Sequence, residues 1–213
     1  MTLREKIDGD FNQALENVIG DREPERLGDL IDTDSLANIY LQHSRIKELM
    51  TYRTYNIINS LNEDGKLQDW LSDRPVFFNA NLDSVEILFV KYAINPEWAD
   101  LPPSIIETSN LHFDATYFGD NIVFRNHPSP ISKDDAELLA HETVHGLQRL
   151  SYSGPNEREI SISFLTAYVE ESRKAKKCSQ NPYLGNIFEK EAYAVAGNNC
   201  SAYIDAEISD EWY

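Results

Sequence analysis

The 213-residue chain carries 36 acidic against 19 basic residues, a net charge of -17, with 41% hydrophobic and 11% aromatic residues. This is enough apolar material to bury a sizeable core in one compact domain, or in one domain with a helical extension. The acidity disfavours nucleic acid as a partner because it repels phosphate backbones, and no apolar stretch is long enough to span a bilayer.

The first 72 residues predict a helical N-terminal extension. Apolar residues at four-residue steps over 3–19 indicate an amphipathic helix that ends at Gly20. A short helix is expected within 24–31, and a longer one over 32–61 that ends in a polar turn. The first residues lack the apolar run of a secretory signal, so we expect a protein that is cytoplasmic as synthesised.

The residue types change after residue 72 towards β-branched and aromatic side chains. Strands are predicted at 76–78 and 84–92, although the apolar run of the second also fits a helix. Residues 111–117 and 121–125 flank a turn signal at Gly119 and Asp120, which predicts a β-hairpin. We therefore expect a second part, spanning the rest of the chain, in which a sheet packs on helices.

The pattern with the clearest indication of a catalytic site is His141-Glu142-Thr143-Val144-His145. On a helix, side chains four residues apart share a face, so both imidazoles can bind one cation while Glu142 lies beside its open position. Ser132 is positioned to cap such a helix, and apolar residues recur at helical spacing after it. The pattern predicts a zinc site with Glu142 as the general base that takes a proton from a metal-activated water.

A zinc site that keeps one position open needs a third protein ligand. Two more helices are predicted, over 156–177 and through 188–195. We favour Glu191 because its helical neighbours are apolar, and a carboxylate on a buried face requires a counter-charge. The alternatives are Glu189, Glu170, Glu171, His127 and His112.

Several other side chains have weaker signals. Gln148 follows His145 by three residues, so it either donates a hydrogen bond near the metal or is a surface amide. Tyr193 is a catalytic candidate for stabilising an oxyanion, with Tyr183 as a second possibility. Cys178 and Cys200 lack metal-ligand spacing, so free thiols are the default and a single disulfide is the alternative.

A family resemblance appears at two neighbouring stretches, 120–125 and 137–148. They resemble the core of a bacterial domain family of zinc metallopeptidases, whose members carry an I-V-F strand before an L-A-H-E-x-x-H-x-x-Q helix and are often associated with toxins or contractile injection systems. Residues 191–196 also resemble the third-ligand helix of gluzincin-type metallopeptidases. Thr143 stands where members usually have Leu, and residues 1–70 have no counterpart in the family.

Together these features predict an α+β, zincin-like protein: a helical extension over 1–72, then a metallopeptidase domain over 73–213 with a small, mostly antiparallel sheet on the metal helix. The strand at 122–125 is expected to be the edge along which a peptide aligns. The expected function is zinc-dependent hydrolysis of a peptide or protein substrate. The alternatives are a catalytically inactive zincin-fold interaction module and a toxin-associated effector delivered by a secretion or injection system. The sequence indicates no oligomeric state.

Overall fold

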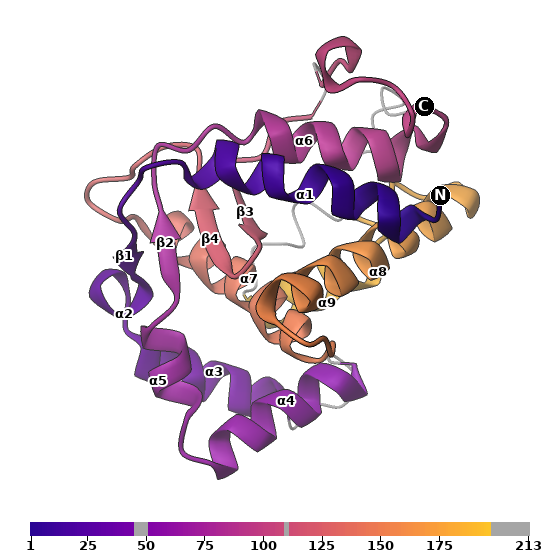
Figure 1. Cartoon of the computed structure of the whole chain (residues 1–213). Coiled ribbons are helices and arrows are strands. Elements are labelled where there is room, and N and C mark those ends of the chain that lie inside the picture. Colours follow the sequence, from indigo (N-terminus) through magenta and orange to yellow (C-terminus); the bar gives the residue numbers. More distant parts are fainter. Residues whose placement is uncertain (45–50, 109–110, 197–213) are drawn as a thin grey trace.

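The computed structural model describes residues 1–44, 51–108 and 111–196, and shows a small sheet surrounded by helices (Figure 1). The strands are β1 (Glu25–Arg26), β2 (Pro75–Phe77), β3 (Ala115–Phe118) and β4 (Asn121–Phe124), in the spatial order β1-β2-β4-β3. β2 pairs in parallel with β4, whereas the two outer pairings are antiparallel. The expected α+β class and the hairpin of β3 and β4 are confirmed. The strand expected at the edge, β4, is central, because β2 pairs with its other side.

The helix that carries the histidine motif, α7 (Lys133–Leu150), begins as predicted. The Ser132 hydroxyl accepts from the backbone N–H of Asp135, and the Asp135 carboxylate accepts from the backbone N–H of Ser132. This reciprocal capping box satisfies two amide donors that the first turn otherwise leaves without partners. The two helices predicted after α7 are also present, as α8 (Glu157–Lys177) and α9 (Ile187–Ala196).

The N-terminal helix α1 (Leu3–Ile19) also follows its prediction. It ends at Gly20, whose φ of 55° lies in the left-handed region that favours glycine. α1 lies beside α6 (Asp83–Phe89) and α8, on the opposite side of the sheet from the following helices (Figure 1). Those are α2 (Leu27–Leu30), α3 (Thr33–Ser44), α4 (Tyr52–Glu63) and α5 (Leu67–Ser72).

The prediction of a single long helix over 32–61 is wrong. Thr51 has extended backbone angles (φ -65°, ψ 151°), and its hydroxyl accepts from the Thr54 amide, so a new helix, α4, begins there. Residues 45–50 lie outside the described part. The short helix expected within 24–31 is confirmed only for α2, because Glu25 and Arg26 form β1 instead.

The prediction of a strand over 84–92 is also wrong. These residues form α6 and then one π-helical turn, Val90–Ile94. The segment is buried on nearly all sides, and an apolar run of that kind has no polar face from which the period can be recognised. Two short 3-10 turns, Pro96–Trp98 and Pro103–Ile105, follow it.

The buried apolar side chains form two clusters, one on each side of the sheet. One cluster joins α1, α6 and α8, and the other joins α2 to α5 with α7 and α9. Residues of the expected extension belong to both, so this segment packs within the same body as the rest of the described chain. A domain boundary at residue 72 stays a prediction.

Two further predictions concern membrane-spanning helices and the two cysteines. None of the helices within the described residues combines the length and apolarity that crossing a membrane requires. Cys178 is an exposed free thiol, whereas Cys200 lies outside the described residues.

Candidate metal centre

Two histidines of α7 and one glutamate of α9 meet in the interior. The Nε2 atoms of His141 and His145 lie 3.2 and 3.1 Å from the two carboxylate oxygens of Glu189. All three residues are buried, with exposures of 4%, 5% and 2%, and their potential ligand atoms lie within 4.8 Å of one another. The spacing predicted for the two imidazoles is therefore present, with a carboxylate beside them.

A third helix, α8, contributes a tyrosine to this group. The Tyr168 hydroxyl donates to Oε1 of Glu189 over 2.5 Å. Burial and the adjacent Glu189 carboxylate raise the pKa of Tyr168, so its hydroxyl stays protonated and acts as a donor. Tyr168 could not be recognised from the sequence, because it has no fixed spacing from the histidine motif.

The buried carboxylate of Glu189 and the adjacent imidazoles shift one another's pKa values. Burial by itself raises the pKa of Glu189, but the two imidazoles outweigh that effect and hold it well below its usual range. Conversely, burial lowers the pKa of His145, but Glu189 and Glu142 raise it to about 9. Without a cation, a proton on an imidazole compensates the buried carboxylate.

These residues fit a divalent cation. Two imidazole nitrogens and one carboxylate are a donor set found in catalytic zinc sites that keep a position open. His141 Nδ1 is buried and has no hydrogen-bond partner, which is unusual for a buried ring nitrogen. A cation bound at the two Nε2 atoms would replace the proton as counter-charge to Glu189.

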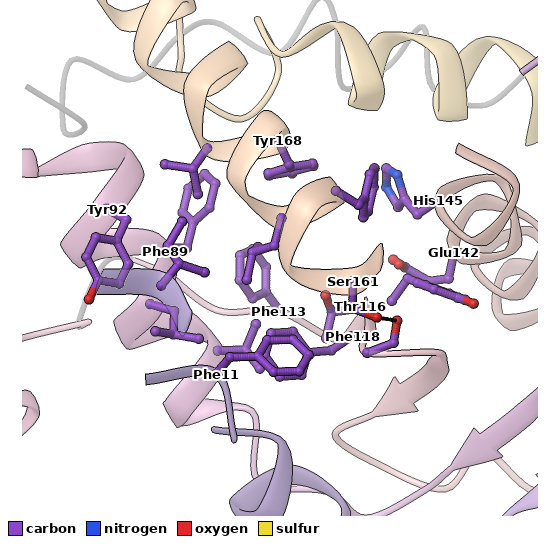
Figure 2. Close-up of a pocket in the computed structure, with 18 of the residues that line it drawn as sticks. Phe11, Phe89, Tyr92, Phe113, Thr116, Phe118, Glu142, His145, Ser161 and Tyr168 are labelled. Carbon is purple, nitrogen blue, oxygen red and sulfur yellow. Dashed lines mark hydrogen bonds between the residues drawn. The ribbon is translucent and has the colours of Figure 1, made fainter. Parts of the chain in front are cut away.

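Glu142 lies beside this group and lines the same cavity as His145 and Glu189 (Figure 2). It is 3% exposed, and burial is the main cause that raises its pKa, although both imidazoles and a hydrogen bond from the Tyr117 backbone act in the opposite direction. A carboxylate with a raised pKa is a better proton acceptor than an ordinary one. Glu142 is not one of the three grouped residues, which matches its predicted role as a base.

The acid of the group is Glu189, and not the favoured Glu191. α9 begins only at Ile187, so few residues before Glu191 are helical neighbours of it. Glu189 lies in the first turn of this helix. Ile187, counted as an apolar neighbour of Glu191, is 47% exposed. Both carboxylates are buried because α9 is enclosed by other helices.

Glu191 instead accepts three hydrogen bonds on the other side of α9. Its donors are the backbone N–H of Thr51, the hydroxyl of Thr54 at 2.9 Å and the Gln148 amide at 2.8 Å. The Gln148 amide oxygen lies 2.8 Å from Nδ1 of His145. Gln148 therefore connects Glu191 to His145, and its amide orientation places an acceptor at Nδ1, which leaves Nε2 for a cation.

This connection predicts a role for Gln148 in metal affinity. Gln148→Met keeps the side-chain length but removes its three hydrogen bonds, to His145, to Glu191 and to the carbonyl of Phe188, so His145 is held less firmly. We expect a zinc affinity about 10–100-fold weaker, the range typical of partners that orient a ligand. Competition with a chromophoric chelator measures it. The same substitution at Gln13, which is exposed on α1, is the matched control and is expected to leave the affinity unchanged. An unchanged affinity in Gln148→Met would contradict the role.

Tyr193, the other catalytic candidate, lies against the centre. Its ring centroid is 4.4 Å from that of His141. Its assignment to oxyanion stabilisation stays a prediction, because the position of the reacting carbonyl is not fixed. Tyr183 lines the cavity but contacts the aromatic rings of Phe89 and Phe113.

The remaining ligand alternatives lie elsewhere. His127 pairs with Glu25, His112 is exposed near Glu86, Glu171 pairs with Lys174, and Glu170 is exposed. None of them belongs to the three-residue group found among the described residues.

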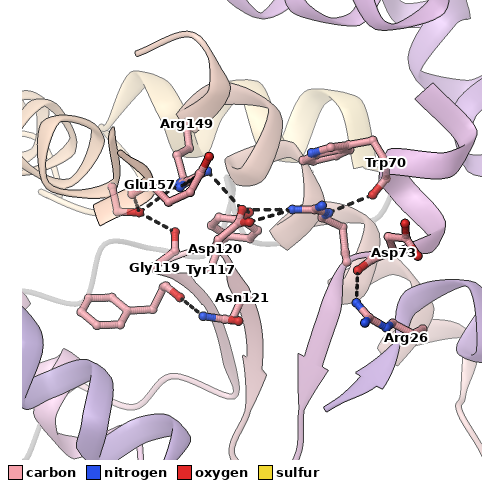
Figure 3. Close-up of polar contacts among 12 residues, drawn as sticks. Arg26, Trp70, Asp73, Tyr117, Gly119, Asp120, Asn121, Arg149 and Glu157 are labelled. Carbon is pink, nitrogen blue, oxygen red and sulfur yellow. Dashed lines mark hydrogen bonds and ion pairs between the residues drawn. The ribbon is translucent and has the colours of Figure 1, made fainter. Parts of the chain in front are cut away.

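The C-terminal half of α7 is anchored by a buried arginine. Arg149, which is 1% exposed, donates to Asp120 in the turn between β3 and β4 over 3.1 Å (Figure 3). Arg74 donates to both oxygens of Asp120, and the Tyr117 hydroxyl donates to one of them over 2.6 Å. This charged network holds α7 against the hairpin, and so positions His145 relative to β3.

Gly146 explains how closely the hairpin can approach. A Cβ atom there would lie 2.8 Å from the Tyr117 ring and 3.0 Å from Trp70, closer than packed atoms allow. Glycine directly after His145 therefore lets β3 pack tightly against α7.

No protein-family model, curated protein or solved structure matches the chain.

Proposed function

We propose that the protein is a zinc-dependent hydrolase of peptide bonds, with His141, His145 and Glu189 as metal ligands and Glu142 as general base. The observation that carries the proposal is the buried group of two imidazoles and a carboxylate, with a second carboxylate on the same cavity. A structural role alone gives no reason to bury two acids and two imidazoles together, since each buried charge costs free energy unless it is compensated. The family resemblance of the α7 motif agrees with this assignment.

Each side chain has a separate task. When bound, a zinc ion supplies Lewis acidity, which polarises a carbonyl group and lowers the pKa of water. The Glu142 carboxylate takes the proton from the attacking water and then gives it to the leaving amine. Tyr168 and Gln148 hold Glu189 and His145 in orientation through their hydrogen bonds. The buried surroundings exclude bulk water and strengthen these electrostatic interactions.

A peptide is the favoured substrate because β3, and not β4, is the edge strand beside Glu142. β3 pairs with β4 on one side, and the Tyr117 backbone lies close enough to Glu142 to lower the pKa of that carboxyl. The outer edge of β3 therefore faces the proposed base. An extended peptide that pairs with this edge would bring its backbone to the site.

The proposal predicts about one zinc ion per chain in the purified protein. Elemental analysis after dialysis measures the content, and removal of zinc with a chelator is expected to lower the melting temperature, because the bound ion stabilises the folded state only. Readdition of zinc is expected to restore it. A folded chain that is metal-free and does not take up added zinc would contradict the proposal and favour the inactive interaction module.

A further inference from the structure

A cavity of about 70 Å³ extends from the candidate metal centre between β3, α8, α6 and α1. Glu142 and His145 lie at one end of it, and Phe11 and Phe89 lie away from them towards the other end (Figure 2). α1 and α6 also contribute the apolar lining side chains Ile7, Val85 and Leu88. A group that enters the cavity can therefore touch the proposed catalytic carboxylate and the N-terminal helix together.

The chemistry of the wall selects an uncharged occupant. Of the lining residues, all within the described chain, none is Lys or Arg, and the acids lie at the metal end. Two lining hydroxyls already have acceptors within the protein: Tyr92 donates to Asp10 over 2.7 Å, and Ser161 donates to the carbonyl of Gly119 over 3.0 Å. A charged group at the apolar end would lose its hydration without gaining a partner.

The size of the cavity argues against a single trapped water. One water needs about 10–15 Å³ and two to four polar partners. This cavity is several times larger and is mostly apolar, and apolar cavities of that kind stay dry or bind apolar ligands. Such a space adjoining a reactive centre is suited to one side chain of a substrate.

We propose that the cavity binds one large uncharged apolar side chain of the substrate, of the Leu, Met or Phe type, next to the bond that is cleaved, and that Phe11 sets its depth. The position relative to the cleaved bond rests on the proposed function, whereas the binding itself does not. Phe11 is 2% exposed, and its ring lies 5.1 Å from that of Phe118 in β3.

Binding can be tested in the metal-free full-length chain by NMR titration with N-acetyl amino-acid amides. The Leu and Phe probes are expected to bind at least about tenfold more tightly than the Gly and Lys probes, because each buried methylene group is worth about a fourfold change in affinity. Val85→Phe fills the cavity from α6 and is expected to abolish the difference. Phe11→Leu deepens it and is expected to shift the preference towards the larger Phe probe.

Val18→Ala is the matched control, because Val18 is fully buried on the same helix but does not line the cavity. It is expected to lower stability and to leave the order of probe affinities unchanged. Equal binding of all four probes, or a preference that survives Val85→Phe, would overturn the proposal.

A second measurement separates this proposal from the proposed function. The zinc-loaded chain is incubated with a peptide library, and the cleavage sites are identified by mass spectrometry. Enrichment of Leu, Met or Phe at one position beside the cleaved bond, weakened by Val85→Phe, supports both proposals. Cleavage without such enrichment would overturn the specificity pocket alone. Probe binding that Val85→Phe removes, without any cleavage, would support the pocket and contradict the peptidase.

Discussion

The Glu142→Gln variant is expected to keep its zinc and to hydrolyse peptides about 10²–10⁴-fold more slowly, the range typical for loss of a general base. An amide has nearly the shape of the carboxylate but cannot take a proton from water. Glu142 is not part of the group that would hold the cation, so the metal content should not change. Elemental analysis and the rate of cleavage of a peptide library measure the two effects separately.

Glu142→Gln is also expected not to lower the melting temperature of the protein. Burial raises the pKa of Glu142, so the folded state penalises the charged carboxylate above the ordinary pKa of the group. A neutral amide removes that penalty, and the melting temperature at neutral pH should not fall. Glu137→Gln on the same helix is the matched control, because Glu137 pairs with Lys133 at the surface. Undiminished hydrolysis in Glu142→Gln would contradict the mechanism even if zinc is present.

The Glu189→Gln variant is expected to lose zinc, whereas Glu191→Gln is expected to retain it with weaker affinity. Glu189 supplies the only carboxylate of the group, and a neutral amide is a poor zinc ligand. We expect its zinc affinity to fall by more than about 100-fold, beyond the range for residues that only orient a ligand. Glu191 contacts Gln148 and not the imidazoles, so its replacement belongs to that milder range.

Metal content, and not melting temperature, decides between these two acids. The pKa of Glu189 is held below its usual range, so its carboxylate stabilises the metal-free fold at pH values above its unfolded pKa. Glu189→Gln therefore loses stability even without zinc, and a lower melting temperature alone is ambiguous. Zinc retained by Glu189→Gln but lost from Glu191→Gln would restore the original choice of Glu191 and contradict the structural assignment.

The start of α7 and the turn of the hairpin could be predicted from the sequence, because residues close to each of them specify the local backbone conformation. Ser132 and Asp135 specify the start of α7 by bonding to backbone groups within one turn, and Gly119 permits the positive φ of the hairpin turn. Such interactions involve residues a few positions apart, so they can be recognised in the sequence. The segment over 84–92 has no such signal in its buried apolar run, and it was predicted with the wrong period.

The helix that presents the two imidazoles and the base could be predicted from the sequence, because helical geometry alone places His141 and His145 on one face and Glu142 beside them. The acid that completes the group could not be predicted, because it depends on how α9 packs in the folded chain. Glu189 and Glu191 lie two residues apart on α9, both are buried, and the packing of that helix between α7 and its neighbours turns Glu189 towards the imidazoles. The cavity likewise depends on tertiary structure, since its walls come from segments distant in sequence that meet only when the chain is folded.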